Sequence, residues 1–322
     1  MGPRLVLWPY FSALIVCCLF GITGNISILM GLFRSDNLRN PCSYLIGVLA
    51  LADLGSNIHF LQQPTLTLIY GGRTMPQNIC FLATSPTLFA LHVESALIWL
   101  VGIDRCLILK IAARYNKMNR TVYMIGMVIP AVTYASVIAA LGFVNMSSEV
   151  DIVFCGASFA LRGAALQVWI LSANVLSILI VATYLYAIMA TRKNADLEDA
   201  TSRRLLVSLA TVGAVYSGTW LLTMILVAVP EILQFSAMWK FHIGSFGGFL
   251  ACVNSSVNCY IYVWRSDVWR RAVFDKVWDP VLKLFGCSSF LMKSPAKKAT
   301  VTVRQAKVEL AGSKTNRPSP RV

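Results

Sequence analysis

Two carboxylates stand alone inside long apolar stretches of the sequence. Asp53 is the only charged residue between Arg39 and Arg73. Glu94 is likewise the only charged residue between Arg73 and Asp104. An ionised carboxylate at membrane depth is costly unless it is paired, protonated or hydrated, and such residues usually serve a function. Two carboxylates close together do not readily both ionise, so one of them is expected to hold a proton.

Three asparagines lie at depths compatible with these carboxylates. The predicted polar or cation site therefore contains Asn25, Asp53, Glu94, Asn254 and Asn258. Its role would be that of a switch or of a cation-binding site. The alternative is a set of hydrogen bonds that only hold helices together.

Other chemistry finds little support in the sequence. His59, His92 and His242 fall on three different predicted helices, and no closely spaced pair of metal ligands exists. No Ser-His-Asp or Cys-His motif is present. We therefore expect no metal, no cofactor and no enzymatic activity.

The elements that position these residues must cross a membrane. Hydrophobic residues make up 57% of the 322 residues and charged residues 13%, whereas soluble domains carry about 25% charged residues. Seven stretches with at most one internal charge run for 24 residues or more, and about 20 residues suffice for a transmembrane helix. They lack the alternating polarity of a membrane barrel. The sequence thus predicts an all-α membrane protein, with a seven-transmembrane helix bundle over residues 8–265.

The basic residues set the orientation of this bundle. Of the 28 Lys and Arg residues, only Arg4, Arg73, Arg162 and Lys240 fall on one side. Positively charged loops stay in the cytoplasm. We expect a short extracellular amino terminus (residues 1–7), a cytoplasmic carboxyl terminus and a location in the plasma membrane. The net charge of +14 then reflects topology and a basic tail, and no nucleic acid partner is expected.

The carboxyl-terminal region divides into two parts. Residues 266–290 place Trp269 and Ala272 at helical spacing among basic residues, which predicts an amphipathic helix on the inner membrane surface. Residues 291–322 are basic and polar and are expected to form a disordered cytoplasmic tail. Cys287, after the amphipathic helix, is a candidate palmitoylation site, although a plain tail cysteine is an equal alternative.

Only two of the nine cysteines face the outside in this topology. Cys80 precedes Arg105 by 25 positions, which is roughly 37 Å of helix, so these residues lie at opposite ends of one span. Cys155 lies in the second outer loop. Because the outside is oxidising, we expect a disulfide between Cys80 and Cys155. Asn145 begins an Asn-x-Ser sequon in the same loop and is a candidate glycosylation site.

The outer half of the bundle offers a mixed, mostly neutral cavity. It suits a small uncharged or weakly polar molecule, or the end of a peptide. The last span, between Lys240 and Arg265, contains no lysine, so a retinal Schiff base is excluded. The predicted ligand-binding residues are Thr87, Leu91, His92, Asn174, Trp220, Thr223, Phe246 and Phe249.

Several short motifs occur in a fixed order and at matching membrane depths. They are Gly24-Asn25, Leu49-Ala50-Leu51-Ala52-Asp53, Cys80 with Asp104-Arg105, Trp220 and Asn258-Cys259-Tyr260-Ile261-Tyr262. Over about residues 10–275, the chain resembles rhodopsin-like (class A) G-protein-coupled receptors. It is most similar to the nematode serpentine chemoreceptors of the SX class, on the motifs Pro41-Cys42-Ser43, Gly102-Ile103-Asp104-Arg105 and Trp264-Arg265-Ser266.

The chain also departs from the pattern of that family. The family's Asp-Arg-Tyr motif ends here in Cys106, and the prolines of its sixth and seventh helices are replaced by Leu222 and Cys259. Proline bends a helix by removing a hydrogen bond. Glycines are expected to supply the missing looseness, namely Gly213, Gly218, Gly244, Gly247 and Gly248.

The resemblance implies an activation switch. Arg105 would contact the sixth helix at rest and the G protein when active, and Asp104 would hold its side chain. Trp220 would form the floor of the ligand pocket, and Tyr262 would swing inward on activation. The implied switch residues are Asp104, Arg105, Tyr216, Trp220, Asn258 and Tyr262.

These observations predict a receptor that passes the signal of an extracellular ligand to a heterotrimeric G protein, with membrane lipid around it. Two alternatives stay open. The first is an ion- or proton-coupled transporter or channel that uses Asp53 and Glu94. The second is a receptor-derived scaffold that no longer signals, because the prolines of two helices are missing.

Overall fold

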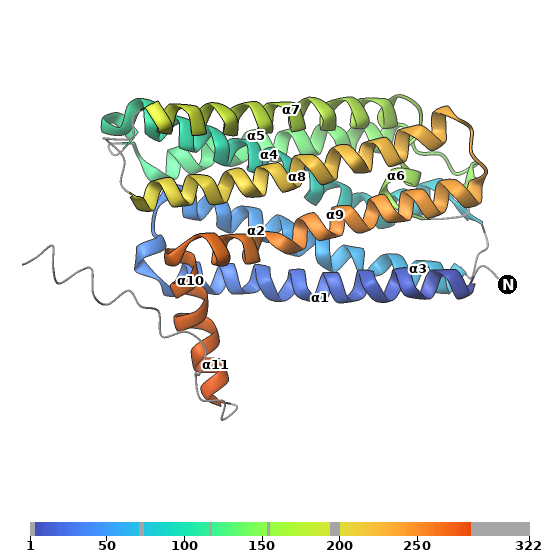
Figure 1. Cartoon of the computed structure of the whole chain (residues 1–322). Coiled ribbons are helices and arrows are strands. Elements are labelled where there is room, and N and C mark those ends of the chain that lie inside the picture. Colours follow the sequence, from blue (N-terminus) through green and yellow to red (C-terminus); the bar gives the residue numbers. More distant parts are fainter. Residues whose placement is uncertain (1–3, 71–73, 116–117, 153–154, 194–199, 285–322) are drawn as a thin grey trace, which may run out of the picture. The chain divides into compact units, whose positions relative to one another are not determined.

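The computed structural model describes residues 4–70, 74–115, 118–152, 155–193 and 200–284. The chain forms two compact units, residues 1–277 and residues 278–322, which are described separately. Seven long helices lie side by side in the first unit (Figure 1). They are α1 (Arg4–Arg34), α2 (Pro41–Phe60), α4 (Gln77–Tyr115), α5 (Arg120–Val144), α7 (Gly163–Lys193), α8 (Ala200–Ile232) and α9 (Ala237–Arg265). The predicted all-α bundle is confirmed.

Shorter elements join the long helices. They are η1 (Asp36–Leu38), α3 (Gln62–Tyr70), β1 (Met75–Pro76), β2 (Asp151–Ile152), α6 (Ala157–Ala160), α10 (Asp267–Val273), η2 (Phe274–Trp278) and α11 (Asp279–Leu284). The two strands pair antiparallel, with Met75 opposite Ile152.

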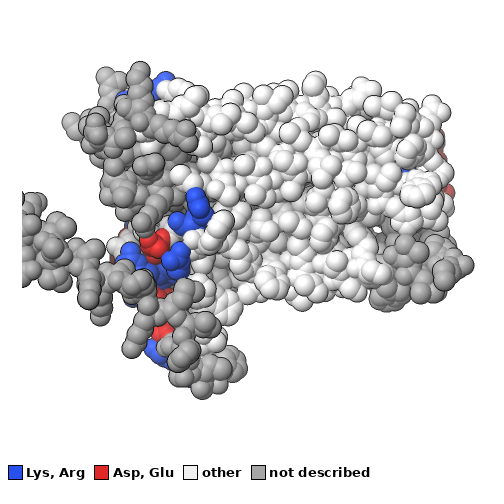
Figure 2. All heavy atoms as spheres, in the orientation of Figure 1, with Lys and Arg blue, Asp and Glu red and all other residues white. Residues whose placement is uncertain are grey.

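The flank of the bundle is built for lipid. In the described part of the chain, six of the long helices are apolar and long enough to cross a membrane. Val122, Leu171 and Ile178 are 67%, 67% and 64% exposed, which suits hydrocarbon and not water. Figure 2 shows this flank almost free of charged side chains, which gather at the end of the bundle beside α10. The chain is therefore a multi-pass membrane protein.

The seventh long helix, α9, is more polar than the other six. It has 29 residues, or about 44 Å of helix, so its length suffices for a crossing. Its polar side chains Asn254, Ser255, Ser256 and Asn258 are buried. These side chains face the bundle, so they lower the hydropathy of α9 without exposing polar groups to lipid.

Local sequence explains where α2 and α5 begin. Both start at the end of the bundle that the basic residues assign to the cytoplasm, which is called the inner end, and the opposite end is called the outer end. Asn40 caps α2, because its side chain accepts a hydrogen bond from the backbone N–H of Ser43 at 3.0 Å, and Pro41 occupies the first helical position. Asn119 caps α5 through the backbone N–H groups of Thr121 and Val122. Both are typical N-cap arrangements, in which a short polar side chain satisfies otherwise unpaired donors.

The outer mouth of the bundle is covered by the loop that carries α6. A disulfide joins Cys80, at the outer end of α4, to Cys155 in this loop, so the predicted pairing is confirmed. The Gln77 side chain donates a hydrogen bond to the carbonyl oxygen of Ala160 and accepts one from the backbone N–H of Ser147 at 2.6 Å. The disulfide and Gln77 together hold the loop against α4.

Ser266 connects α9 directly to α10. Its backbone N–H donates to the carbonyl oxygen of Tyr262 at 2.9 Å, and its hydroxyl accepts from the backbone N–H of Trp269 at 3.5 Å. The Arg270 side chain donates to two carbonyl oxygens in the last turn of α9. The end of one helix therefore also caps the start of the next.

The apolar face of α10 packs against protein. Trp269, Ala272 and Val273 are buried, and the rings of Trp269 and Tyr262 stack at 6.0 Å. A Cβ atom on Gly31 of α1 would lie 3.5 Å from Val273. This corrects the expectation that these apolar side chains rest on the inner leaflet. The location of residues 266–290 at the membrane surface stays a prediction, and Cys287 and the tail (291–322) lie outside the described residues.

Close packing explains two of the glycines that were expected to loosen helices. A Cβ atom on Gly213 of α8 would lie 2.6 Å from the ring of Tyr184. A Cβ atom on Gly244 of α9 would lie 2.5 Å from the ring of Phe159. Both contacts are too short for any larger residue. Gly218 differs, because nothing lies within 4 Å of the place its Cβ atom would take.

We expect the substitution Gly218→Ala to stabilise the protein by up to about 1 kcal/mol, since alanine favours a helix interior over glycine by that amount. If Gly218 supplies the looseness of α8, the same substitution will also lower ligand-driven signalling. Thermal unfolding of the purified protein in detergent tests the first effect. Gly213→Ala is the contrasting variant and should destabilise the protein through its clash with Tyr184. If Gly218→Ala left the stability unchanged or lowered it, the expectation that alanine stabilises α8 at this position would be wrong.

Candidate functional site

The two isolated carboxylates meet in the middle of the bundle. Asp53 on α2 and Glu94 on α4 are completely buried, and their carboxyl groups interact with each other. The Asn258 side chain donates to Asp53 Oδ2 at 2.7 Å, and the Ser255 hydroxyl donates to Glu94 Oε2 at 3.1 Å. One face of α9 therefore supplies a donor to each carboxyl group, and the pair joins three helices.

The other predicted members of the polar site, Asn25 and Asn254, form hydrogen bonds with groups other than the two carboxylates. The Asn25 side chain donates to the carbonyl oxygen of Ser255 at 2.9 Å, and Asn57 donates to the same oxygen at 3.1 Å. Asn254 accepts a hydrogen bond from the Thr219 hydroxyl of α8 at 2.6 Å. Ser255 and Asn57 were missed in the sequence. The spacing could have indicated Ser255, which lies three residues before Asn258 on the same helix face.

Each carboxyl group keeps one oxygen without a hydrogen-bond partner among the described residues, namely Asp53 Oδ1 and Glu94 Oε1. Within that part of the chain, no group of three or more His, Cys, Asp or Glu residues is arranged to hold a metal ion. Two buried carboxyl groups in contact can share a proton, which removes one of two like charges. The arrangement therefore suits a proton better than a multivalent metal.

An aromatic cluster adjoins the carboxyl pair. The Tyr216 hydroxyl of α8 is hydrogen-bonded to the Ser95 hydroxyl of α4, the residue next to Glu94. The Tyr216 ring stacks on Trp220 at 5.7 Å, and Trp220 meets Trp169 of α7 edge to face at 6.4 Å. Ser95 and Trp169 were also missed in the sequence, because nothing in their local pattern marks them. The cluster links α4, α7 and α8.

Most of the predicted ligand-binding residues lie inside the bundle. Thr87, Leu91, His92, Trp220 and Thr223 are buried, and Asn174 is half-buried. His92 Nδ1 lies 2.6 Å from the carbonyl oxygen of Leu88, so its Nε2 atom is left for another partner. Phe246 and Phe249 do not join this set. Phe246 is 50% exposed, and Phe249 lines a groove on the outside between α1 and α9.

The helical periodicity of α9 explains why Phe246 and Phe249 lie on the outside of the bundle. Phe246 and Phe249 share a helix face with Val253 and Val257, which line the same outer groove. That face turns away from the aromatic cluster. The position of a residue along its helix does not reveal which way the side chain points around that helix.

Two small hollows lie beneath the α6 loop. The first is lined by residues that include His59, Gln63 and Thr87. The second is lined by residues that include Phe159 and Gly244. Each has room for little more than a water molecule, about 30 Å³ and 20 Å³. The loop that carries α6 contributes Gly156 to the first hollow and Phe159 to the second.

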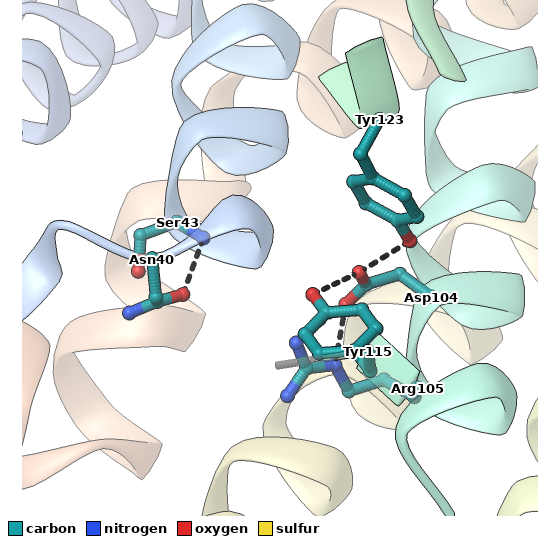
Figure 3. A network of polar contacts seen from close by, with 6 residues as sticks. All are labelled: Asn40, Ser43, Asp104, Arg105, Tyr115 and Tyr123. Atoms are coloured by element: carbon teal, nitrogen blue, oxygen red, sulfur yellow. Dashed lines mark hydrogen bonds and ion pairs between the residues drawn. The ribbon is translucent and has the colours of Figure 1, made fainter. Parts of the chain in front are cut away.

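Asp104 organises the inner end of the bundle (Figure 3). Its Oδ1 atom accepts hydrogen bonds from the Tyr115 hydroxyl at 2.8 Å and from the Tyr123 hydroxyl at 2.7 Å. Its Oδ2 atom accepts from Arg105 Nε at 3.0 Å. The two tyrosine rings meet edge to face at 5.5 Å. Four side chains thus form one network around a fully buried carboxylate.

The two tyrosines were missed in the sequence. Tyr115 lies eleven residues after Asp104, which is about 16 Å along a straight helix and too far for a hydrogen bond. The backbone of α4 is kinked at Ile111, between the two residues. Burial, followed by the nearby Asp104 carboxylate, raises the pKa of Tyr115. Its hydroxyl therefore keeps its proton at neutral pH and can donate to Asp104. The cysteine that replaces the family's tyrosine, Cys106, contacts the carbonyl oxygen of Thr183 on α7 at 3.7 Å.

Two further switch predictions stay untested. Arg105 was expected to contact the sixth helix, but the side chains of α8 at residues 200–206 lie outside the described residues. Tyr262 was expected to move inward on activation. It is buried, and its hydroxyl has no hydrogen-bond partner in the described part of the chain, so no bond in this state opposes such a movement.

We expect Tyr115→Phe and Tyr123→Phe each to lower the stability by about 1.5–3 kcal/mol, the usual contribution of a hydrogen bond to a charged group. Thermal unfolding of the purified variants measures the loss. Tyr186→Phe is the matched control, because this ring lies 5.1 Å from the Lys110 ammonium and that contact does not need a hydroxyl. Equal stability of all three variants would show that the hydroxyls of Tyr115 and Tyr123 contribute nothing.

The fold and this site define a seven-helix membrane receptor: a disulfide-anchored outer loop, a buried polar centre and an Asp-Arg pair at the inner end. A comparison with protein families gives the particular family. The model of the serpentine type 7TM GPCR chemoreceptor Srsx family matches residues 18–278, about four-fifths of the chain. The chain belongs to this family, as the resemblance in the sequence predicted. The family is one of receptors and not of enzymes.

Proposed function

We propose that the protein is a plasma-membrane chemoreceptor with an extracellular amino terminus, and that it transmits binding of a small neutral ligand to a heterotrimeric G protein. Membership of a chemoreceptor family supports the general part of this proposal. The asymmetry of the basic residues supports the orientation. The basic loops that would meet the G protein include Lys110, which is exposed at the inner end of α4.

One observation carries the proposal: a continuous buried path leads from the aromatic cluster to the carboxyl pair. It runs from Trp220 through the Tyr216 ring to the Ser95 hydroxyl. The next residue, Glu94, contacts Asp53 and Ser255. A ligand against Trp220 would therefore act on α4, α8 and α9 together. It can shift the receptor only by binding one arrangement of these helices more tightly than the other.

The described surroundings of this path favour an uncharged ligand. The buried residues of the predicted ligand set carry no acidic or lysine side chain. Trp220 Nε1 and Ser245 Oγ have no hydrogen-bond partner among the described residues, so they are free to bind polar groups of a ligand. An ion beside these residues would lose its hydration without gaining a counter-charge, and the carboxyl groups of Glu94 and Asp53, further along the path, already accept hydrogen bonds from Ser255 and Asn258.

Two modifications are also proposed, namely glycosylation of Asn145 and palmitoylation of Cys287. Asn145 ends α5, and its side-chain amide donates to the carbonyl oxygen of Leu141 at 2.8 Å. Glycosylation of Asn145 would use one of the two N–H groups of this amide and leave the other to donate to Leu141. Palmitoylation of Cys287 concerns a residue outside the described part of the chain.

The carboxyl pair keeps one alternative function open. Asp53 and Glu94 are buried at the centre of a membrane protein, which also suits a proton-coupled transporter or channel. In that case Asp53→Asn or Glu94→Gln would abolish a ligand-independent proton flux into liposomes. A receptor shows no such flux with or without these substitutions.

The test of the proposed function is a nucleotide-exchange assay in membranes that contain the receptor and G protein. A panel of small ketones, esters, alcohols and pyrazines is screened, and we expect at least one to increase exchange. Arg105→Ala should remove this response, because it deletes the charged group at the inner end. Arg39→Ala, which removes an exposed arginine paired with Asp36, is the matched control. A response that survives Arg105→Ala would contradict the proposed role of this residue.

A further inference from the structure

Three of the free cysteines gather where α1 meets α9. The Sγ atoms of Cys18 on α1 and Cys252 on α9 lie 3.4 Å apart, and both side chains are completely buried. Cys17, the preceding residue on α1, interacts with the same Cys252 thiol. The functions proposed above use none of these thiols. The thiol of Cys252 therefore has two thiols of α1 as neighbours.

Cys17 connects this group of thiols to the lipid. It is half-buried and lines the groove on the outside of the bundle between α1 and α9. It lies eight residues after Pro9, where the apolar span of α1 begins, so it is about 12 Å into the hydrocarbon. Cys18 and Cys252 do not line the groove. A reagent dissolved in the bilayer therefore meets Cys17 first.

The surroundings favour a covalent bond between these thiols over a bound metal ion. Within the described residues, the three thiols are not arranged to hold a metal ion. Two thiolates around a monovalent ion such as Cu⁺ would also leave a net negative charge, which is costly in hydrocarbon. A disulfide is neutral. Its sulfur atoms are about 2.05 Å apart, so those of Cys18 and Cys252 must approach by about 1.4 Å.

The neighbours of Cys17 are those that a reactive thiol needs. The thiolate is the form that attacks an oxidant. A thiolate at Cys17 can accept hydrogen bonds from the Cys252 thiol and from the Ser256 hydroxyl, whose oxygen lies 3.5 Å from Cys17 Sγ. Cysteines that respond to oxidants are typically accessible and lie beside a second thiol that resolves the first product. Cys17 and Cys252 meet both conditions.

We propose that Cys17, Cys18 and Cys252 form an oxidation site, at which a hydroperoxide from the bilayer causes a disulfide to form between α1 and α9. The Cys17 sulfur attacks the terminal oxygen of the hydroperoxide ROOH. The O–O bond breaks, the alcohol ROH leaves with the thiol proton, and Cys17 becomes a sulfenic acid. The Cys252 sulfur then attacks the Cys17 sulfur. The S–S bond forms, the S–O bond breaks, and water leaves with the proton of Cys252.

Cys18 passes the disulfide to the inside of the bundle. Its sulfur is in contact with that of Cys252, so it can attack the new disulfide, form the Cys18–Cys252 bond and return the proton to Cys17. Either disulfide holds α9 to α1 one helical turn from Ser255, the residue that donates to Glu94. The oxidation site needs only that the chain lies in a bilayer, so it is independent of the ligand and the G protein.

Oxidation of the purified protein in phosphatidylcholine nanodiscs tests the proposal. The discs are treated with cumene hydroperoxide, which is soluble in lipid, the remaining thiols are alkylated, and disulfide-linked peptides are identified by mass spectrometry. We expect Cys252 to become linked to Cys17 or Cys18, and to lose its free thiol several-fold faster than Cys259. Cys259 is the matched control, because it is also buried on α9 and packs against Gly24 of α1.

Three variants separate the roles of the thiols. Cys252→Ala should abolish both disulfides. Cys17→Ala should slow the formation of the Cys18–Cys252 bond several-fold, because the oxidant must then reach a buried thiol. Cys18→Ala should leave only the Cys17–Cys252 bond. Should Cys252→Ala prevent folding, the double variant Cys17→Ala/Cys18→Ala removes both partners and should likewise leave Cys252 without a disulfide.

Three results would overturn the proposal. Equal loss of the free thiols of Cys252 and Cys259 would show that the three thiols only pack together. Oxidation of Cys17 to sulfinic or sulfonic acid without a disulfide would show that Cys252 does not resolve the sulfenic acid. A disulfide between two copies of the chain, seen as a dimer on a non-reducing gel, would assign Cys17 to a contact between copies.

Discussion

Asp104→Ala should destabilise the receptor by about 3–5 kcal/mol, the usual cost of breaking a buried ion pair from one side. The substitution removes the acceptor of Tyr115, Tyr123 and Arg105 at once. The Arg105 side chain, which is 11% exposed, would keep its charge without a partner. Thermal unfolding in detergent measures the loss of stability.

The same substitution should raise ligand-independent nucleotide exchange, because Arg105 is no longer held by Asp104. Asp36→Ala provides the control. It breaks an exposed pair with Arg39, for which a loss of about 0–1 kcal/mol is normal. If Asp104→Ala were no more destabilising than Asp36→Ala, the network in Figure 3 would not support the inner end of the bundle.

Cys80→Ser is expected to have a comparable effect at the outer end. The disulfide to Cys155 closes a loop with a sequence separation of 75 residues, and the loss of chain entropy for such a loop corresponds to about 4.5 kcal/mol. Structure that persists in the membrane without the disulfide will reduce this value. We expect the variant to reach the cell surface poorly, which flow cytometry of an amino-terminal epitope measures.

The double variant Cys80→Ser/Cys155→Ser should behave like the single variant, since both lack the same bond. Cys106→Ser is the control, because this thiol is free and makes only a long contact with a carbonyl oxygen. A double variant far less stable than Cys80→Ser would show that Cys155 contributes mainly through its packing.

The sequence revealed the features that depend on depth in the membrane. Charge-free stretches gave the seven helices. The distribution of basic residues placed Cys80 and Cys155 on the same side, and the disulfide between them agrees with this. Depth also indicated that Asp53 and Glu94 lie at the same level, which is necessary for their meeting although it does not fix which way each side chain points. These features were predictable because the bilayer excludes charge along one axis, which a linear sequence records directly.

Features that depend on rotation around a helix were harder to predict. Phe249 lies at a suitable depth for ligand binding but on the outer face of α9. The side chains of Tyr115 and Tyr123 reach Asp104 from opposite sides of a loop, so no spacing within one helix reveals the three-way contact. Trp269 was recognised as part of an apolar helix face, but its stacking on Tyr262 of α9 was not predicted. In each case the deciding contact joins residues of different elements.

The shared cap at Ser266 has a mechanical consequence. Only Ser266 separates α9 from α10, and Arg270 is hydrogen-bonded to the last turn of α9. A rotation of α9 must therefore also move α10. The buried ring of Trp269, which stacks on Tyr262 of α9, strengthens this connection. An environment-sensitive fluorescent probe attached to α10 should therefore respond to changes in the helices around Asp53 and Glu94. It would do so although α10 lies beyond the end of α9.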